Sequence, residues 1–224
     1  MSKNLIFDCD GVLYPLTELS VREIVEAMKS VYRTELHLNG EQQTEISHKT
    51  QQEGHLGMFN YIREMCKTAD YNFDKFCRKM SDRINYNNIK PNYGLWNTLQ
   101  ILKQDNNLVI WSNNSRVHLD KVFQRVFNKD IMQITEQGIQ VVDIKSTRYK
   151  GYFYPKQSTE GLALFLRRTG FKPEDCVLFD DTPANISVAE KYGLKGVLVD
   201  GYETLRTNLK TYMPQVKKQG KIYE

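Results

Sequence analysis

Short apolar runs separated by longer amphipathic segments are the main pattern along this chain. Four of these runs have the length and the continuous apolar character of strands buried on both faces, as in a parallel sheet. They lie at residues 5–7, 108–111, 176–179 and 196–199. Around them apolar residues recur at helical spacing, for example at Leu95, Leu99 and Leu102. The alternation of strands and helices predicts an α/β fold with a doubly wound parallel sheet.

Residues 16–90 interrupt this alternation. They contain helical periodicity, clearest over 21–32, and no run that indicates a buried strand. A stretch at 90–94 that includes a proline and a glycine marks the return to the alternating pattern. We therefore expect an α/β core domain formed by residues 1–15 and 91–224, with a helical cap domain inserted at 16–90.

The composition is that of an ordinary globular protein. The 224 residues are 40% hydrophobic and 26% charged, with a formal net charge of +4. Lysine and arginine are interspersed with acidic residues and do not form a long run, so we expect no nucleic-acid partner. No apolar stretch is long enough to cross a bilayer and no signal peptide is visible, so we expect no membrane partner.

The cysteines have no C-x-x-C pair and no spacing typical of a zinc site or a disulfide framework. They are Cys9, Cys66, Cys77 and Cys176. This usage fits a reducing compartment, so we expect a cytoplasmic location. Export without a recognisable signal stays open, and the sequence does not indicate an oligomeric state.

Two carboxylates, Asp8 and Asp10, follow the first predicted strand, and Gly11 comes directly after them. On an extended chain, residues i and i+2 point to the same side, so both acids could face one ligand. The same residues also suit a simple polar turn after a strand. A second acidic pair, Asp180 and Asp181, ends the third predicted strand and makes a functional site the better interpretation.

If the first and third predicted strands are neighbours, these four carboxylates converge. Like charges at one site repel and raise one another's pKa, so a divalent cation is the natural compensation. Oxygen-only ligands suit Mg²⁺, which binds one or two carboxylates together with a substrate phosphate. We therefore expect Mg²⁺ as the cofactor.

The second predicted strand ends in Ser112 and Asn113, just before the N-terminus of a predicted helix, where an anion could bind. Serine and asparagine are also the favoured helix-capping residues, so this stretch alone does not identify a phosphate site. A basic residue would complete such a site. Lys145, Lys150 and Lys156 all precede the third predicted strand, and composition does not choose among them.

In their order, these motifs resemble those of the haloacid dehalogenase-like (HAD) hydrolase superfamily. The first, second and fourth motifs of that family resemble Asp8-x-Asp10-Gly11-x-x-Tyr14, Ser112-Asn113 and Asp180-Asp181-x-x-x-Asn185. The third motif is a lysine upstream of the paired acids. Lys156 lies 24 residues before Asp180, which matches the family's usual spacing best. The family usually has a proline after this lysine, whereas Pro155 precedes it here.

The resemblance implies a Rossmann-like core with an inserted helical cap. It also implies that the protein is a magnesium-dependent phosphomonoesterase. Asp8 would attack phosphorus and form an aspartyl-phosphate, and Asp10 would act as the general acid and base. The implied metal ligands are Asp8, the backbone carbonyl of Asp10, Asp181 and, through water, Asp180. The implied phosphate-binding residues are Ser112, Asn113 and Lys156.

Tyr14 and the long helix expected after it resemble the pyrimidine 5'-nucleotidase branch of the family. This implies a small phosphomonoester substrate, such as a nucleoside 5'-monophosphate. In the predicted cap, the stretch 53–58 with His55 is either a substrate-contacting loop or a simple turn between helices.

Two alternatives to a phosphatase stay open. One is a sugar phosphomutase of the same fold. The other is a catalytically silent binding protein that uses the cap or the segment 137–154 to hold a partner. This segment lengthens the connection between the second and third motifs, and we expect it to form an extra loop or hairpin.

Overall fold

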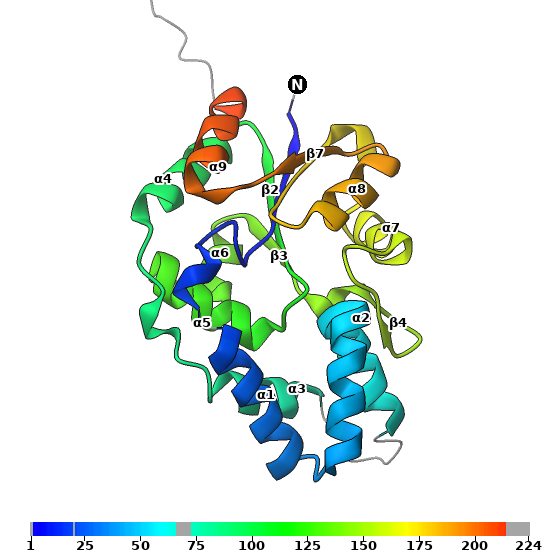
Figure 1. The fold of residues 1–224 in the computed structure, drawn as a ribbon. Helices are drawn as coiled ribbons and strands as arrows, with labels where there is room; N and C mark the ends of the chain where they lie inside the picture. The colour runs from blue at the N-terminus through cyan, green and yellow to red at the C-terminus, as the bar shows by residue number, and fades with distance from the viewer. Residues whose placement is uncertain (1, 20, 66–72, 214–224) are drawn as a thin grey trace, which may run out of the picture.

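A five-stranded parallel sheet forms the centre of the computed structural model, which describes residues 2–19, 21–65 and 73–213 (Figure 1). Its strands lie in the order β3-β2-β1-β6-β7, and all neighbouring pairs are parallel. In chain order they are β1 (Asn4–Phe7), β2 (Asn107–Trp111), β3 (Ile139–Val142), β6 (Cys176–Asp180) and β7 (Lys195–Leu198). The predicted α/β fold with a doubly wound parallel sheet is confirmed.

Strand β1 lies in the middle of the sheet, where the strand order reverses. Leu5 is in register with Leu108 of β2 on one side and with Val177 of β6 on the other. The chain builds β2 and β3 outward on one side and then returns to build β6 and β7 on the other. In parallel sheets, ligands bind outside the carboxyl ends of the strands at such a reversal. Asp8 and Asp180 lie at these ends.

Helices cover both faces of the sheet, because successive strand residues point to opposite faces. Leu5 and Phe7 of β1 belong to one apolar cluster, whereas Ile6 belongs to the other. Figure 1 shows the resulting layers. Residues of α4 (Tyr93–Leu102), α5 (Arg116–Phe127) and α9 (Gly201–Leu209) belong to the first cluster, and residues of α7 (Thr159–Thr169) and α8 (Pro183–Lys191) belong to the second.

The segment 137–154 contributes a strand to the central sheet, which we did not expect. Helix α6 (Ile131–Glu136) leads into β3, whose residues pair in parallel with β2. The chain then forms an antiparallel hairpin of β4 (Arg148–Tyr149) and β5 (Tyr152–Phe153), so the predicted hairpin is present beside the unpredicted strand. Strand β3 lies at the edge of the sheet and Gln140 is exposed, so the segment lacks the continuous apolar run typical of a central strand.

Helices occupy the described residues between 16 and 90, and no strand is found among them. They lie beyond the carboxyl ends of the sheet strands, at the bottom of Figure 1. The α-helices of this segment are α1 (Val21–Thr34), α2 (Gly40–Met65) and α3 (Phe73–Ser81). The 3-10 helices of the described chain are η1 (Leu16–Glu18), η2 (Tyr86–Asn88), η3 (Ile144–Thr147), η4 (Pro173–Asp175) and η5 (Lys210–Tyr212). None of the helices in the described ranges is both long and apolar enough to span a bilayer.

The expectation of a loop or turn at 53–58 is wrong, because the backbone of this stretch is helical and belongs to α2. Each glycine within a helix costs about 1 kcal/mol relative to alanine, a penalty that a long helix with many good helix-forming residues can absorb. The side chain of His55 lies outside the described residues, so its proposed substrate contact stays a prediction.

The β4–β5 hairpin binds the helices that lie over the sheet ends. The Asn60 side chain of α2 donates to the Phe153 carbonyl at 3.0 Å and accepts from the Phe153 amide at 2.9 Å. The Phe73 ring of α3 lies 4.6 Å from the Phe153 ring, centroid to centroid. Next to these contacts, Lys145 and Asp74 form an ion pair at 2.6 Å. The hairpin therefore joins α2 and α3 to the segment that leads into Lys156.

Replacing Asn60 with alanine is expected to destabilise the protein by about 1–3 kcal/mol, because it removes the two hydrogen bonds that this side chain makes with the Phe153 backbone. Urea unfolding of the wild type and the variant measures this change. Asn97→Ala, at an exposed position of α4, is the matched control and should change the free energy of unfolding by less than about 0.5 kcal/mol. Equal stabilities of the Asn60 and Asn97 variants would contradict this prediction.

Candidate active site

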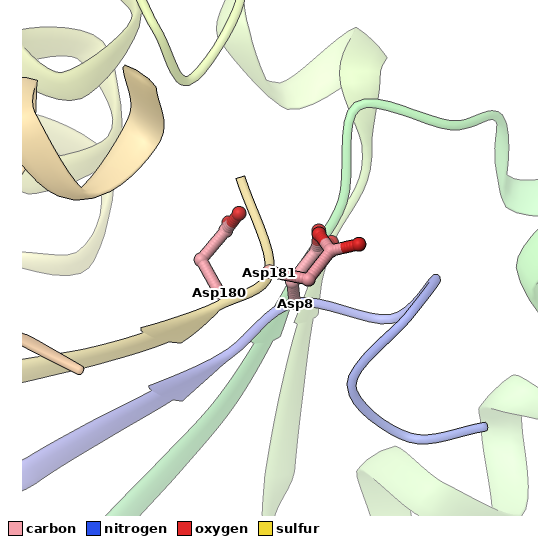
Figure 2. Close-up of side chains that lie close together, drawn as sticks. All are labelled: Asp8, Asp180 and Asp181. Atoms are coloured by element: carbon pink, nitrogen blue, oxygen red, sulfur yellow. The ribbon is translucent and has the colours of Figure 1, made fainter. Parts of the chain in front are cut away.

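Three carboxylates meet at the carboxyl ends of β1 and β6. Asp8 directly follows β1, Asp180 is the last residue of β6, and Asp181 comes next. One oxygen from each lies within 4.8 Å of the others, close enough to share a metal ion. Figure 2 shows the three side chains projecting from the same end of these neighbouring strands. The carboxylate of Asp10, the fourth predicted acid, is not part of this cluster.

Gly11 allows the chain after Asp10 to pass close to Asp181. Its φ of +80° lies in the left-handed region that favours glycine. A Cβ atom at this position would lie 2.2 Å from Oδ2 of Asp181, much closer than a non-bonded contact allows. Glycine at this position therefore permits both the turn after Asp10 and the close approach of the Asp181 carboxylate.

The ammonium group of Lys156 is buried between two of the carboxylates. Its Nζ lies 2.7 Å from Oδ1 of Asp8 and 2.7 Å from Oδ2 of Asp180. It also donates to the carbonyl of Trp111 at 3.2 Å. Only 2% of the residue is exposed. Of the three lysines considered from the sequence, Lys156 lies at the strand ends, whereas Lys145 pairs with Asp74.

Asp180, which binds the Lys156 ammonium, is itself held in place by hydrogen bonds. Its second oxygen, Oδ1, accepts from the Asn185 side chain at 2.8 Å and from the Thr182 amide at 2.9 Å. Asp180 is fully buried, so its hydrogen bonds replace the water that an exposed carboxylate would bind. Asp181 is half-buried, and its Oδ1 accepts from the Thr182 hydroxyl at 3.2 Å.

The electrostatics of the cluster favour a bound cation. Burial raises the pKa of Asp8 above its usual range; Lys156 opposes this shift, and Asp180 and Asp10 add to it. Burial and the neighbouring Asp180 also raise the pKa of Asp181. Burial alone would lower the pKa of Lys156, but Asp8 and Asp180 outweigh it and raise that pKa. Since one ammonium does not balance three carboxylates, the donor set fits a divalent cation with oxygen ligands.

Ser112 and Asn113 follow β2, beside the other edge of β1. Ser112 is buried, and its hydroxyl accepts from the Asn114 amide at 3.0 Å. The Asn113 side chain accepts from the backbone amide of Lys156 at 3.1 Å, which ties this loop to the lysine. Ser115 caps α5 by accepting from the His118 backbone amide at 3.4 Å, so the helix cap lies just after Ser112 and Asn113.

The side chain of Asp10 is held by three residues. Tyr14 donates its hydroxyl to Oδ1 at 2.5 Å, and Asn114 donates its amide to Oδ2 at 2.8 Å. Nε2 of His118 lies 2.8 Å from Oδ1. Burial alone would raise the pKa of Asp10, but His118 and the hydrogen bonds outweigh it and lower that pKa. The environment therefore stabilises the ionised form of Asp10.

Sequence reasoning missed His118 and Asn114. His118 lies in the first turn of α5 and is buried, four residues before the buried Val122, so the helical pattern assigns it to a core-facing position without indicating a partner. Asn114 directly follows the predicted phosphate-binding residues Ser112 and Asn113. Neither residue carries a local signal that points to Asp10, because they meet it only through the packing of α5 against the start of the chain.

Comparison with known proteins agrees with this geometry. A family model described as haloacid dehalogenase-like hydrolase matches residues 3–193. The chain therefore belongs to the HAD-like hydrolases, and the predicted enzyme class is confirmed. No curated protein matches the chain closely enough to count as a relative.

Solved structures of low sequence identity share the fold. A HAD family enzyme from Bacteroides thetaiotaomicron, in complex with magnesium and inorganic phosphate, is 17% identical, with a TM-score of 0.52 over 89% of this chain and 95% of that chain. A mutant of CbbY from Rhodobacter sphaeroides, in complex with xylulose 1,5-bisphosphate, is 15% identical, with a TM-score of 0.56 over 90% and 88%. A predicted HAD-like family hydrolase from Porphyromonas gingivalis is 16% identical, with a TM-score of 0.54 over 96% and 100%.

Replacing Lys156 with methionine is expected to destabilise the protein by about 3–5 kcal/mol, because two buried carboxylates lose the ammonium between them. Lys145→Met is the matched control, since it removes an exposed ion pair with Asp74 and should cost no more than about 1 kcal/mol. Urea unfolding at pH 7 measures both values. A Lys156 variant as stable as the Lys145 variant would show that the buried bridge is not needed for folding.

Proposed function

We propose that this HAD-like hydrolase is a magnesium-dependent phosphomonoesterase that acts through an aspartyl-phosphate on Asp8. The observation that carries the proposal is the position of Asp8. It lies at the strand-order reversal of the sheet, 2.7 Å from a buried ammonium and within an acidic cluster suited to a metal. A carboxylate held between cationic groups can approach a phosphate dianion, which an isolated carboxylate would repel.

Magnesium is the cation we assign to the cluster. Asp8 and Asp181 would bind it directly, with the backbone carbonyl of Asp10 as a further ligand and Asp180 acting through water. The hydrogen bonds of Asp180 support an indirect role, because both of its oxygens already accept from protein groups. When bound, Mg²⁺ supplies positive charge that offsets the charge of the phosphoryl oxygens. The magnesium and phosphate bound by the Bacteroides enzyme agree with this assignment.

Two displacements at phosphorus make up the reaction. In the first, an oxygen of Asp8 bonds to phosphorus, the bond from phosphorus to the alcohol oxygen breaks, and Asp10, which must hold a proton when substrate is bound, gives that proton to the alcohol oxygen. In the second, water attacks the aspartyl-phosphate, Asp10 takes a proton from the water, and inorganic phosphate leaves Asp8 free. The hydrogen bonds that favour the ionised form of Asp10 suit this second step.

The transferring phosphoryl group would be bound by Ser112, Asn113 and Lys156. Ser112 and Asn113 come from the loop that leads into the N-terminus of α5, and backbone amides at a helix N-terminus can donate to an anion. Lys156 would contribute charge from the side of β6. Donors of this kind stabilise charge that develops on the phosphoryl oxygens in the transition state.

We further propose that residues 16–90 form a cap domain on a core of residues 1–15 and 91–224. Helices α1 to α3 lie beyond the strand ends, where they can cover a bound substrate and contact its leaving group. A covered site favours a small phosphorylated metabolite over a phosphoprotein. A nucleoside 5'-monophosphate is the first substrate to test, and a sugar phosphate is the second because CbbY was solved with xylulose 1,5-bisphosphate.

Asp8→Asn is expected to abolish phosphate release, because an amide cannot act as the nucleophile. The assay follows phosphate release from p-nitrophenyl phosphate, nucleoside monophosphates and sugar phosphates, with Mg²⁺ or with EDTA. We expect turnover by the wild type with Mg²⁺ only, and unchanged turnover by Asp105→Asn, an exposed control. A phosphomutase would instead show sugar-phosphate isomerisation that depends on a bisphosphate. Absence of turnover on the whole panel by folded, magnesium-loaded protein would refute the phosphatase proposal.

Gly11→Ala is expected to weaken Mg²⁺ binding by at least about tenfold, because the new Cβ displaces the Asp181 carboxylate. Isothermal titration calorimetry measures the affinity directly. Gly170→Ala is the matched control, since its φ of +71° carries similar backbone strain but no atom lies near the added Cβ. Equal affinities in the two variants would exclude Asp181 from the metal site.

A further inference from the structure

The interactions of Asp10 extend through His118 to Tyr86. His118 Nε2 lies 2.8 Å from Oδ1 of Asp10, and its Nδ1 lies 2.9 Å from the hydroxyl of Tyr86. His118 and Tyr86 are 4% and 7% exposed, so water does not readily replace either contact. The chain Asp10–His118–Tyr86 therefore links the loop after β1 to α5 and to η2.

The direction of these hydrogen bonds follows from the chemistry of Asp10. An ionised carboxylate only accepts hydrogen bonds, so Nε2 of His118 carries the proton that it shares with Asp10. Nδ1 faces the hydroxyl of Tyr86, which can donate to a bare Nδ1 or accept from a protonated one, so this contact holds the ring in either case. A histidine ring held at both nitrogens has one orientation.

The supports of Asp10 differ in rigidity. Tyr14 follows Asp10 by only four residues in the same loop, and Asn114 belongs to the loop after β2. His118, by contrast, is anchored in α5, whose buried residues include Leu119 and Val122 of the apolar core. His118 thus ties the carboxylate to the rigid body of the molecule.

We propose that His118 is a positioning residue that sets the orientation of Asp10, with Tyr86 holding the imidazole in place. This inference rests on the proposed phosphatase function, in which Asp10 gives a proton to the leaving oxygen and takes one from water. Proton transfer of this kind requires the two heavy atoms to come within hydrogen-bonding distance at a suitable angle. A freely rotating Asp10 would meet this requirement only part of the time.

Proton transfer from Asp10 predicts that the loss in kcat/KM depends on the leaving group of the substrate. An alkoxide is a poor leaving group and needs a proton as it departs, whereas p-nitrophenolate leaves without one. The value of kcat/KM covers the steps up to departure of the alcohol, so it isolates this effect from the later attack by water. Misplacement of Asp10 should therefore lower kcat/KM for an alkyl phosphate much more than for p-nitrophenyl phosphate.

The test compares His118→Ala and His118→Gln with the wild type on p-nitrophenyl phosphate and on the best alkyl phosphate of the panel. For His118→Ala we expect a loss of about 100-fold in kcat/KM on the alkyl ester, the scale of general acid catalysis, and a loss below tenfold on the aryl ester. His118→Gln should recover most of the loss, because its amide nitrogen can donate to the same oxygen of Asp10. His48→Ala, at an exposed position of α2, is the control and should match the wild type.

Equal losses on both esters without rescue by glutamine would overturn the positioning role and leave the phosphatase function standing.

An NMR measurement of the His118 ring tests the positioning role without depending on turnover. In a ¹⁵N-labelled sample, the imidazole signals of His118 should report a proton on Nε2, and Asp10→Ala should shift that proton's resonance. An unprotonated Nε2 in the wild type would also overturn the inference. Absence of turnover by the wild type on every ester would refute the phosphatase function and, with it, the role of His118.

Discussion

The ammonium of Lys156, buried between Asp8 and Asp180, is the interaction on which the rest of the site depends. It joins the ends of β1 and β6, two neighbouring strands that each end in a carboxylate, and it offsets charge that the sheet ends could not otherwise bury. The single ammonium does not offset all of the negative charge, since Asp181 lies in the same cluster. The remaining negative charge explains why the site suits a divalent cation with oxygen ligands.

The strand order converts this local interaction into a reaction site. Because β1 lies at the reversal, the loops after β1, β2 and β6 all leave the same end of the sheet, and residues as distant as Asp10, Asn114 and His118 come into contact there. The core strands and α5 supply the rigid positions. Helices α1 to α3 lie beyond the carboxyl ends of the strands, and the hairpin contacts of Asn60 connect α2 to the segment that carries Lys156.

Much of this arrangement could be predicted from residue patterns, and the failures have physical causes. The central strands β1, β2 and β6 and the edge strand β7 contain short apolar runs, and the convergence of the acids after β1 and β6 follows from the topology of a parallel sheet. Edge strand β3 has the exposed Gln140 within its short apolar run and so lacked that signal. The glycines within 53–58 suggested a loop, but the surrounding helix of α2 absorbs their cost. His118 resembled an ordinary core position, since a sequence does not show which buried polar groups meet across the fold.

Mass spectrometry of the acid-quenched reaction tests the proposed chemistry at its first step. The protein is mixed with Mg²⁺ and its best phosphomonoester, quenched within the turnover time, and digested. We predict that the peptide containing Asp8 gains the mass of one phosphoryl group, and that hydroxylamine, which cleaves acyl phosphates, removes it. Turnover of the ester with no phosphoryl group on Asp8 at any quench time, or with the group on another residue, would contradict this account.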